Sequence, residues 1–135
     1  MKVILRNILV TISAILIGAM VNGLLVQLGF MVIAPPAGYD FNTEQGMSEG
    51  MAAMEPRHFV FPFLAHAVGT LLGGLIAARF AANGQFRLAM IISTIFFLGG
   101  LYMVATLPSP IWFTILDLTL AYFPMGWLAY RLGRR

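Results

Sequence analysis

Residues 59–82 read FVFPFLAHAVGTLLGGLIAARFAA, an apolar stretch whose only charged side chain is Arg79. An α-helix needs about 20 such residues to cross the hydrocarbon core of a bilayer, so the stretch predicts a membrane-spanning helix. Gly69, Gly73 and Ala77 recur every four positions and therefore lie on one face of that helix. Such small residues allow a second helix to approach closely within a membrane.

Three other apolar runs have a similar length, so the sequence predicts spans at residues 8–33, 59–82, 88–107 and 112–130. The composition agrees, because 60% of the 135 residues are hydrophobic and 10% are charged. Soluble domains average about 45–50% apolar and about 25% charged residues. A soluble fold of this size cannot bury so much apolar surface. We therefore expect one all-α transmembrane domain over residues 1–135, arranged as a four-helix bundle.

The basic residues predict the orientation of the spans. Those on one side of the predicted membrane are Lys2, Arg6, Arg79, Arg87, Arg131, Arg134 and Arg135, whereas Arg57 alone lies on the other side. Lysine and arginine accumulate on cytoplasmic loops, so both termini are expected in the cytoplasm. Because these residues sit at span ends and form no basic stripe, we expect no nucleic-acid partner. The expected partners are membrane lipids and either further copies of the chain or a larger membrane complex.

The outer loop, residues 34–57, is the longest connection between spans. It begins at Pro35-Pro36, which cannot continue a helix. Asn42 followed by Gln45 resembles a helix-capping box. Behind it, Met47, Met51 and Met54 share one side of a short helix. We therefore expect an amphipathic segment that lies on the outer membrane surface.

Asp117 is the only acidic residue inside a predicted span. A carboxylate at the centre of a membrane helix costs roughly 2.5–3.5 kcal/mol on insertion scales, so it should face the bundle interior and have a partner. His66 lies at a similar depth and is the expected partner. Asn22, Tyr102 and Thr70 are further candidates for the same polar cluster. This cluster is either a site for a proton, cation or ligand, or a hydrogen-bonded clasp that fixes helix register.

Small residues on each predicted span indicate where the helices pack. The packing positions that we expect are Gly18, Gly69, Gly73, Ala77, Gly100 and Ala121. Several of these residues share a face with the polar candidates, so the polar groups are predicted to lie inside the bundle rather than toward lipid.

Two weaker patterns suggest metal ligands, although no cofactor is expected as the first interpretation. Glu55 and His58 form Glu-x-x-His, and His66 lies on the same helix face as His58. Glu44 and Glu49 complete such a site only if the loop folds back. The alternative is that Glu55 caps the helix that follows.

The second metal pattern combines Met47, Met51 and Met54 with His58, because soft thioethers suit Cu(I). Methionines at this spacing also serve as ordinary apolar contacts. The chain has no cysteine, which excludes thiolate ligands and cysteine nucleophiles. No nucleophile–base motif is present either, so an enzyme is the less favoured interpretation.

Three stretches resemble a family of uncharacterised small four-span bacterial inner-membrane proteins. They are PRHFVFPFLAHAVGT at residues 56–70, LPSPIWF at 107–113 and DLTLAYFPMGW at 117–127. The resemblance covers nearly the whole chain. It implies a multi-pass four-helix bundle in a bacterial inner membrane and implies no activity.

The sequence therefore favours a non-enzymatic structural, accessory or assembly role for a bundle stabilised by its polar cluster. The first alternative is a small proton- or cation-coupled transporter or channel that uses Asp117 and His66. The second alternative is a membrane metal-binding protein or enzyme that uses Glu55, His58 and His66.

Overall fold

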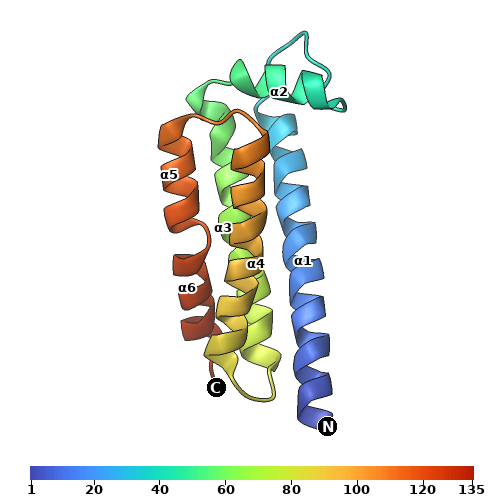
Figure 1. The fold of residues 1–135 in the computed structure, drawn as a ribbon, viewed down its shortest axis with the longest axis vertical. Coiled ribbons are helices and arrows are strands. Elements are labelled where there is room, and N and C mark those ends of the chain that lie inside the picture. The colour runs from blue at the N-terminus through green and yellow to red at the C-terminus, as the bar shows by residue number, and fades with distance from the viewer.

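A computed structural model describes residues 1–135, and the chain is all-helical (Figure 1). The elements in chain order are α1 (Lys2–Val32), α2 (Glu44–Ala52), a 3₁₀-helix η1 (Pro56–Phe59), α3 (Val60–Phe80), α4 (Gln85–Thr106), α5 (Ile111–Leu120) and α6 (Phe123–Gly133). Four segments are long and apolar enough to cross a membrane, namely α1, η1 with α3, α4, and α5 with α6. These properties identify a multi-pass membrane protein.

The four long segments run side by side, and α2 lies across one end of the bundle (Figure 1). Both chain termini lie at the opposite end. We refer to these two ends as the loop end and the terminal end. At the terminal end, Gly84 has a φ of +64° and joins α3 to α4 in a tight turn. Glycine adopts this left-handed conformation without the steric penalty that a side chain would bring.

Helix α1 is longer than the span predicted from its apolar residues. It begins at Lys2, before the apolar run that starts at residue 8. Hydropathy identifies the part of a helix that suits lipid, whereas lysine and arginine are themselves good helix formers. The first turns, in which Lys2, Arg6 and Asn7 are interspersed with apolar residues, therefore extend the helix beyond the predicted run.

The last span is broken, which corrects the prediction of one continuous helix over residues 112–130. Helix α5 ends at Leu120 and α6 begins at Phe123. Pro124 has no N–H to donate to the carbonyl of Leu120, and its ring clashes with a continuous helix. The N–H of Tyr122 donates no backbone hydrogen bond either. The break turns Tyr122 inward, where its side chain is almost completely buried.

The short helix α2 is present where an amphipathic segment was expected, but its cap differs. Thr43 is the N-cap, and its Oγ1 accepts a hydrogen bond of 3.1 Å from the backbone N–H of Gly46. The predicted cap, Asn42, instead donates to the carboxylate of Asp40 through both its backbone and its side-chain amide. Gln45 pairs with Glu49 rather than with the cap. The Asp40 carboxylate therefore binds Asn42, and Thr43 takes the capping position that the sequence pattern assigned to Asn42.

The bundle interior consists mostly of alanine and glycine. Gly18 on α1 faces Gly69 on α3, so a Cβ on Gly18 would lie 2.8 Å from the Gly69 carbonyl oxygen. Gly73 approaches the backbone of Ala14 in the same way. Ala77 forms a buried cluster with Ala14 and Ile92. These contacts hold the backbones close together, which is how helices associate in lipid.

Candidate functional site

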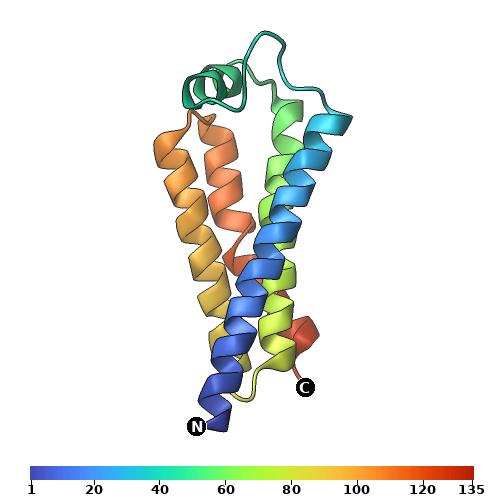
Figure 2. The ribbon, with the colours of Figure 1, turned by 90° about the vertical axis from the view of Figure 1, so that its right-hand side faces the viewer.

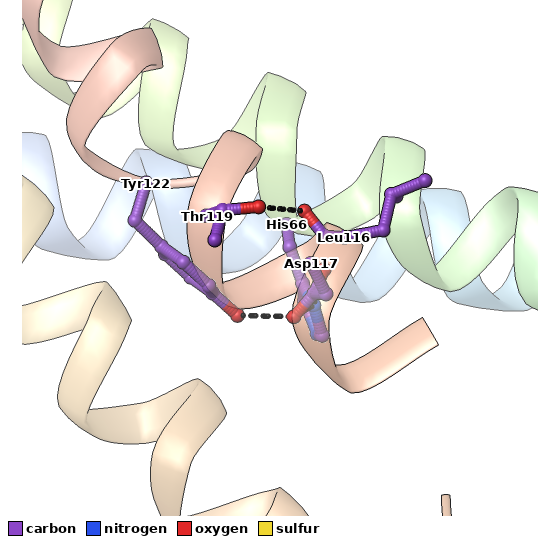
Figure 3. Close-up of polar contacts among 5 residues, drawn as sticks. All are labelled: His66, Leu116, Asp117, Thr119 and Tyr122. Carbon is purple, nitrogen blue, oxygen red and sulfur yellow. Dashed lines mark hydrogen bonds and ion pairs between the residues drawn. The ribbon is translucent and has the colours of Figure 1, made fainter. Parts of the chain in front are cut away.

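His66 on α3 and Asp117 on α5 form the central polar contact of the bundle (Figure 3). The ring Nδ1 lies 2.9 Å from Asp117 Oδ1 and 3.0 Å from Oδ2, so the N–H donates to both carboxylate oxygens. The side chain of Asp117 is 2% exposed and that of His66 is 20% exposed. The predicted partner, His66, therefore forms the hydrogen bonds that the buried Asp117 carboxylate needs. Of the two side chains, only that of His66 is partly exposed.

Tyr122 is the third member of this cluster. Its hydroxyl donates a hydrogen bond of 3.0 Å to Asp117 Oδ2 (Figure 3). Its ring also stacks on the imidazole of His66. Gly100 on α4 makes room for it, because a Cβ at this position would collide with the Tyr122 hydroxyl. Tyr122 was not among the polar residues expected in the cluster from the sequence. Pro124 was the available signal, since a break before it changes which residues face inward.

The other polar candidates lie outside the hydrogen-bonded cluster. Tyr102 is 67% exposed on the outer surface of α4, which excludes it from the polar layer. Asn22 packs through its Cβ against Gly69 at the contact between α1 and α3 and makes no hydrogen bond to the pair. Thr70 is fully buried one turn from His66, and its Oγ1 has no hydrogen-bond partner. The cluster therefore comprises His66, Asp117 and Tyr122, called the polar cluster below.

A cavity of about 200 Å³ extends from the polar cluster to the loop end. It is lined by Val26, Phe30, Phe41, Met47, Met51, Met54, Phe59, Pro62, His66, Gly100, Met103, Val104, Leu107, Ser109, Phe113 and Asp117. His66 and Asp117 are the only titratable residues in this lining. The cavity is therefore an apolar chamber that contains one acid–histidine pair.

The second ring nitrogen of His66, Nε2, is the atom of this cavity that can bind a proton or a cation. Asp117 occupies Nδ1, whereas Nε2 has no hydrogen-bond partner. In such an arrangement the carboxylate fixes the tautomer and orientation of the ring, and the free nitrogen can accept a proton or bind a cation. Tyr122 supports the carboxylate from its other side. The geometry is thus suited to proton exchange or to cation binding.

The predicted metal site at Glu55, His58 and His66 is not assembled. His58 Nδ1 accepts a hydrogen bond of 2.9 Å from the backbone N–H of Glu55, and Nε2 donates to the carbonyl of Ala34 over 3.1 Å. The Glu55 carboxylate pairs with Arg57 instead. Because Pro56 starts the helix, Glu55 and His58 form its capping box. Both nitrogens of His58 thus close the outer loop and are not free to bind a metal.

The methionines of the loop also lie differently from the predicted outward-facing copper site with His58. Met47, Met51 and Met54 line the cavity, together with Met103 on α4. Helix α2, which lies across the loop end of the bundle (Figure 2), therefore contributes methionines to the same cavity that His66 lines.

No family model, no curated protein and no solved structure matches this chain. Its function is therefore inferred from the geometry of the cavity and the polar cluster.

Proposed function

We propose that this chain is a proton-coupled carrier that binds a small cation in the cavity and exchanges it for a proton on His66 and Asp117. The supporting observation is the cavity itself, whose only titratable lining residues are this pair. A structural clasp, the role that the sequence favours, requires no open volume beside the acid. The cavity therefore favours the transport alternative.

The charge of the pair explains why a cation is the expected ligand. With His66 neutral, the cavity contains one carboxylate in surroundings of low polarity, where an uncompensated charge is costly. Either a proton on His66 or a bound cation compensates that charge. The two cations therefore compete for one site, and this competition is the physical basis of coupled exchange.

The size of the cavity restricts the ligand. Pockets for drug-sized molecules have volumes of roughly 300–1,000 Å³, whereas this one has about 200 Å³. We therefore expect a metal ion or a compact organic cation rather than a large amphipathic drug.

The proposed orientation places the cavity in the outer half of a bacterial inner membrane, with both termini in the cytoplasm. This orientation follows from the basic residues at the terminal end and from the single arginine, Arg57, near the loop end. A ligand would then enter from the outer side, past α2.

The test measures proton release from proteoliposomes that contain a pH-sensitive dye. Tetraethylammonium nitrate and silver nitrate are the two probe cations, added to the outside. We expect at least one of them to drive proton movement with the native chain. Asp117→Asn preserves the size of the side chain and keeps one acceptor oxygen but removes the charge, so we expect the variant to remain folded and to lose the movement.

Tyr102→Phe is the matched control, because Tyr102 is a polar residue of a spanning helix that lies outside the cavity. It should leave proton movement unchanged. If neither probe moves protons, or if Asp117→Asn moves them as well as the native chain, the carrier proposal is wrong and the clasp is the better interpretation.

A further inference from the structure

We infer that the cation of this site is a soft monovalent metal ion, Cu(I) or its analogue Ag⁺, held by Met47 and Met51 of α2 and by Met54, which follows that helix. This inference rests on the proposed cation-carrier function and specifies its ligand class. Its basis is that Met47, Met51, Met54 and Met103 line the same cavity as His66 and Asp117.

The three loop methionines are positioned to act together. Met47 and Met51 are four residues apart on one side of α2, where neighbours at such spacing lie about 5–6 Å apart at Cβ. Met54 follows the end of the helix, and its N–H still donates to the carbonyl of Met51 over 3.2 Å. Met103 faces them from α4. Flexible thioethers from two elements therefore border one open space.

The donor atoms decide which ion fits. Thioether sulfur is a soft, neutral ligand that suits Cu(I), whereas Na⁺-like and Mg²⁺- or Ca²⁺-like hard ions require several oxygen ligands. Beyond the Asp117 carboxylate, the only side-chain oxygen in the lining is that of Ser109. Imidazole also suits copper, and His66 Nε2 has no other partner. The cavity is therefore matched to a soft ion and poorly matched to a hard one.

A purely apolar role explains these methionines less well. A methionine that only fills space packs against its neighbours, but these side chains border a volume of about 200 Å³. They are also partly exposed at the loop end. Such residues can therefore receive an ion from water and deliver it toward His66.

The exchange step balances without any oxidation or reduction. The metal ion remains monovalent as it passes from the α2 thioethers to Nε2 of His66. The imidazolium loses one proton as the ion binds, and this proton leaves through the cavity. One positive charge replaces another beside the Asp117 carboxylate, so the net charge of the site is unchanged.

The experiment compares two matched sets of methionine substitutions in the full chain, purified in detergent without oxygen. The cavity variant is Met47→Leu with Met51→Leu and Met54→Leu. The control variant is Met20→Leu with Met31→Leu and Met125→Leu, none of which lines the cavity. Leucine preserves volume and apolarity, so both variants should fold. Cu(I) affinity is measured by competition with bathocuproine disulfonate.

We expect the cavity variant to bind Cu(I) more than about tenfold more weakly, since even loss of an outer-shell partner costs about 10–100-fold in metal affinity. The control variant should match the native chain. X-ray absorption of the Cu(I)-loaded native protein should show copper–sulfur scattering that is weaker in the cavity variant, which retains only Met103 of the methionines that line the cavity. Equal affinity in all three proteins, or equal loss in both variants, would overturn the inference.

The two proposals fail in different ways. If tetraethylammonium drives Asp117-dependent proton movement while Cu(I) affinity is independent of the α2 methionines, the carrier stands and the soft-metal inference is wrong. If Cu(I) binding depends on these methionines but Asp117→Asn leaves proton movement unchanged, the metal site stands and the proton exchange is wrong. A single substitution, Met51→Leu, provides the same readout should the triple variant fold poorly.

Discussion

The two halves of the bundle are built from different residues. In the terminal half, glycines and alanines meet across helix contacts, as Gly74 does with Ala129 and Gly133 does with Ala78. In the loop half, phenylalanines and methionines surround the cavity. Helix α1 stays against α3 along its length, whereas α1 and α4 separate toward the loop end (Figure 2). The break between α5 and α6 lies between the two halves.

This difference separates the part that holds the bundle together from the part that offers a site. Lipid gives helices no hydrophobic reason to associate, so close backbone contacts through small residues provide the stability. Large side chains keep backbones apart and leave volume between them. The polar cluster lies where the terminal half meets the loop half, and it therefore contributes both to stability and to the site.

The largest expected effect tests the polar cluster as a structural element. Replacing His66 by leucine leaves the Asp117 carboxylate buried with only Tyr122 as partner, which should reduce the free energy of unfolding by about 3–5 kcal/mol. The measurement is unfolding of the purified protein in mixed detergent micelles. The double variant His66→Leu with Asp117→Leu should recover part of the loss. An undiminished stability of His66→Leu would mean that the cluster contributes little to folding.

The next effect tests the close helix packing of the terminal half. A Cβ on Gly126 would overlap the hydroxyl of Ser93, so Gly126→Ala should reduce stability by about 1–3 kcal/mol through overpacking. Gly99 provides the control, because a Cβ there would meet no atom within 4 Å. Gly99→Ala should be neutral or stabilise the helix by up to about 1 kcal/mol. Equal effects at both glycines would contradict the contrast between packed and open surfaces.

A smaller effect tests the boundary between the halves. Tyr122→Phe removes one hydrogen bond to Asp117 Oδ2. Hydrogen bonds between membrane helices contribute about 0.6 kcal/mol on average, so we expect a loss of that order in an unfolding titration. Gly100→Ala should displace the same hydroxyl and act in the same direction. If Gly100→Ala were harmless, Tyr122 would not depend on the space at Gly100.

The smallest effect tests the looser packing of the loop half. Met51→Leu conserves volume at the edge of the cavity, so the change in unfolding free energy should stay well below about 1.5 kcal/mol. Ile92→Ala, in the buried cluster of the terminal half, should reduce the free energy of unfolding by about 2–5 kcal/mol in the same assay. Similar losses at Met51 and Ile92 would show that the loop half is packed as firmly as the terminal half.

Much of this arrangement could be predicted from the sequence. Apolar length determines where helices can cross a bilayer, so the four spans are visible in the residues alone. A single acid within those spans needs a polar partner, and His66 was the titratable residue at the same depth. Depth along a helix is fixed by residue number, which is why this contact could be anticipated.

The remaining features depend on how the helices are rotated and interrupted, which residue number does not determine. Tyr122 joins Asp117 because the chain is interrupted before Pro124, whereas Tyr102 lies on the outward side of α4. Helix α2 turns its methionines over the cavity, and the loop that carries it is closed by His58 against Ala34. The sequence alone determined a membrane bundle with one buried acid and its histidine. Only the tertiary structure decided that this pair opens onto a cavity, because empty volume arises from the mutual spacing of helices rather than from any single segment.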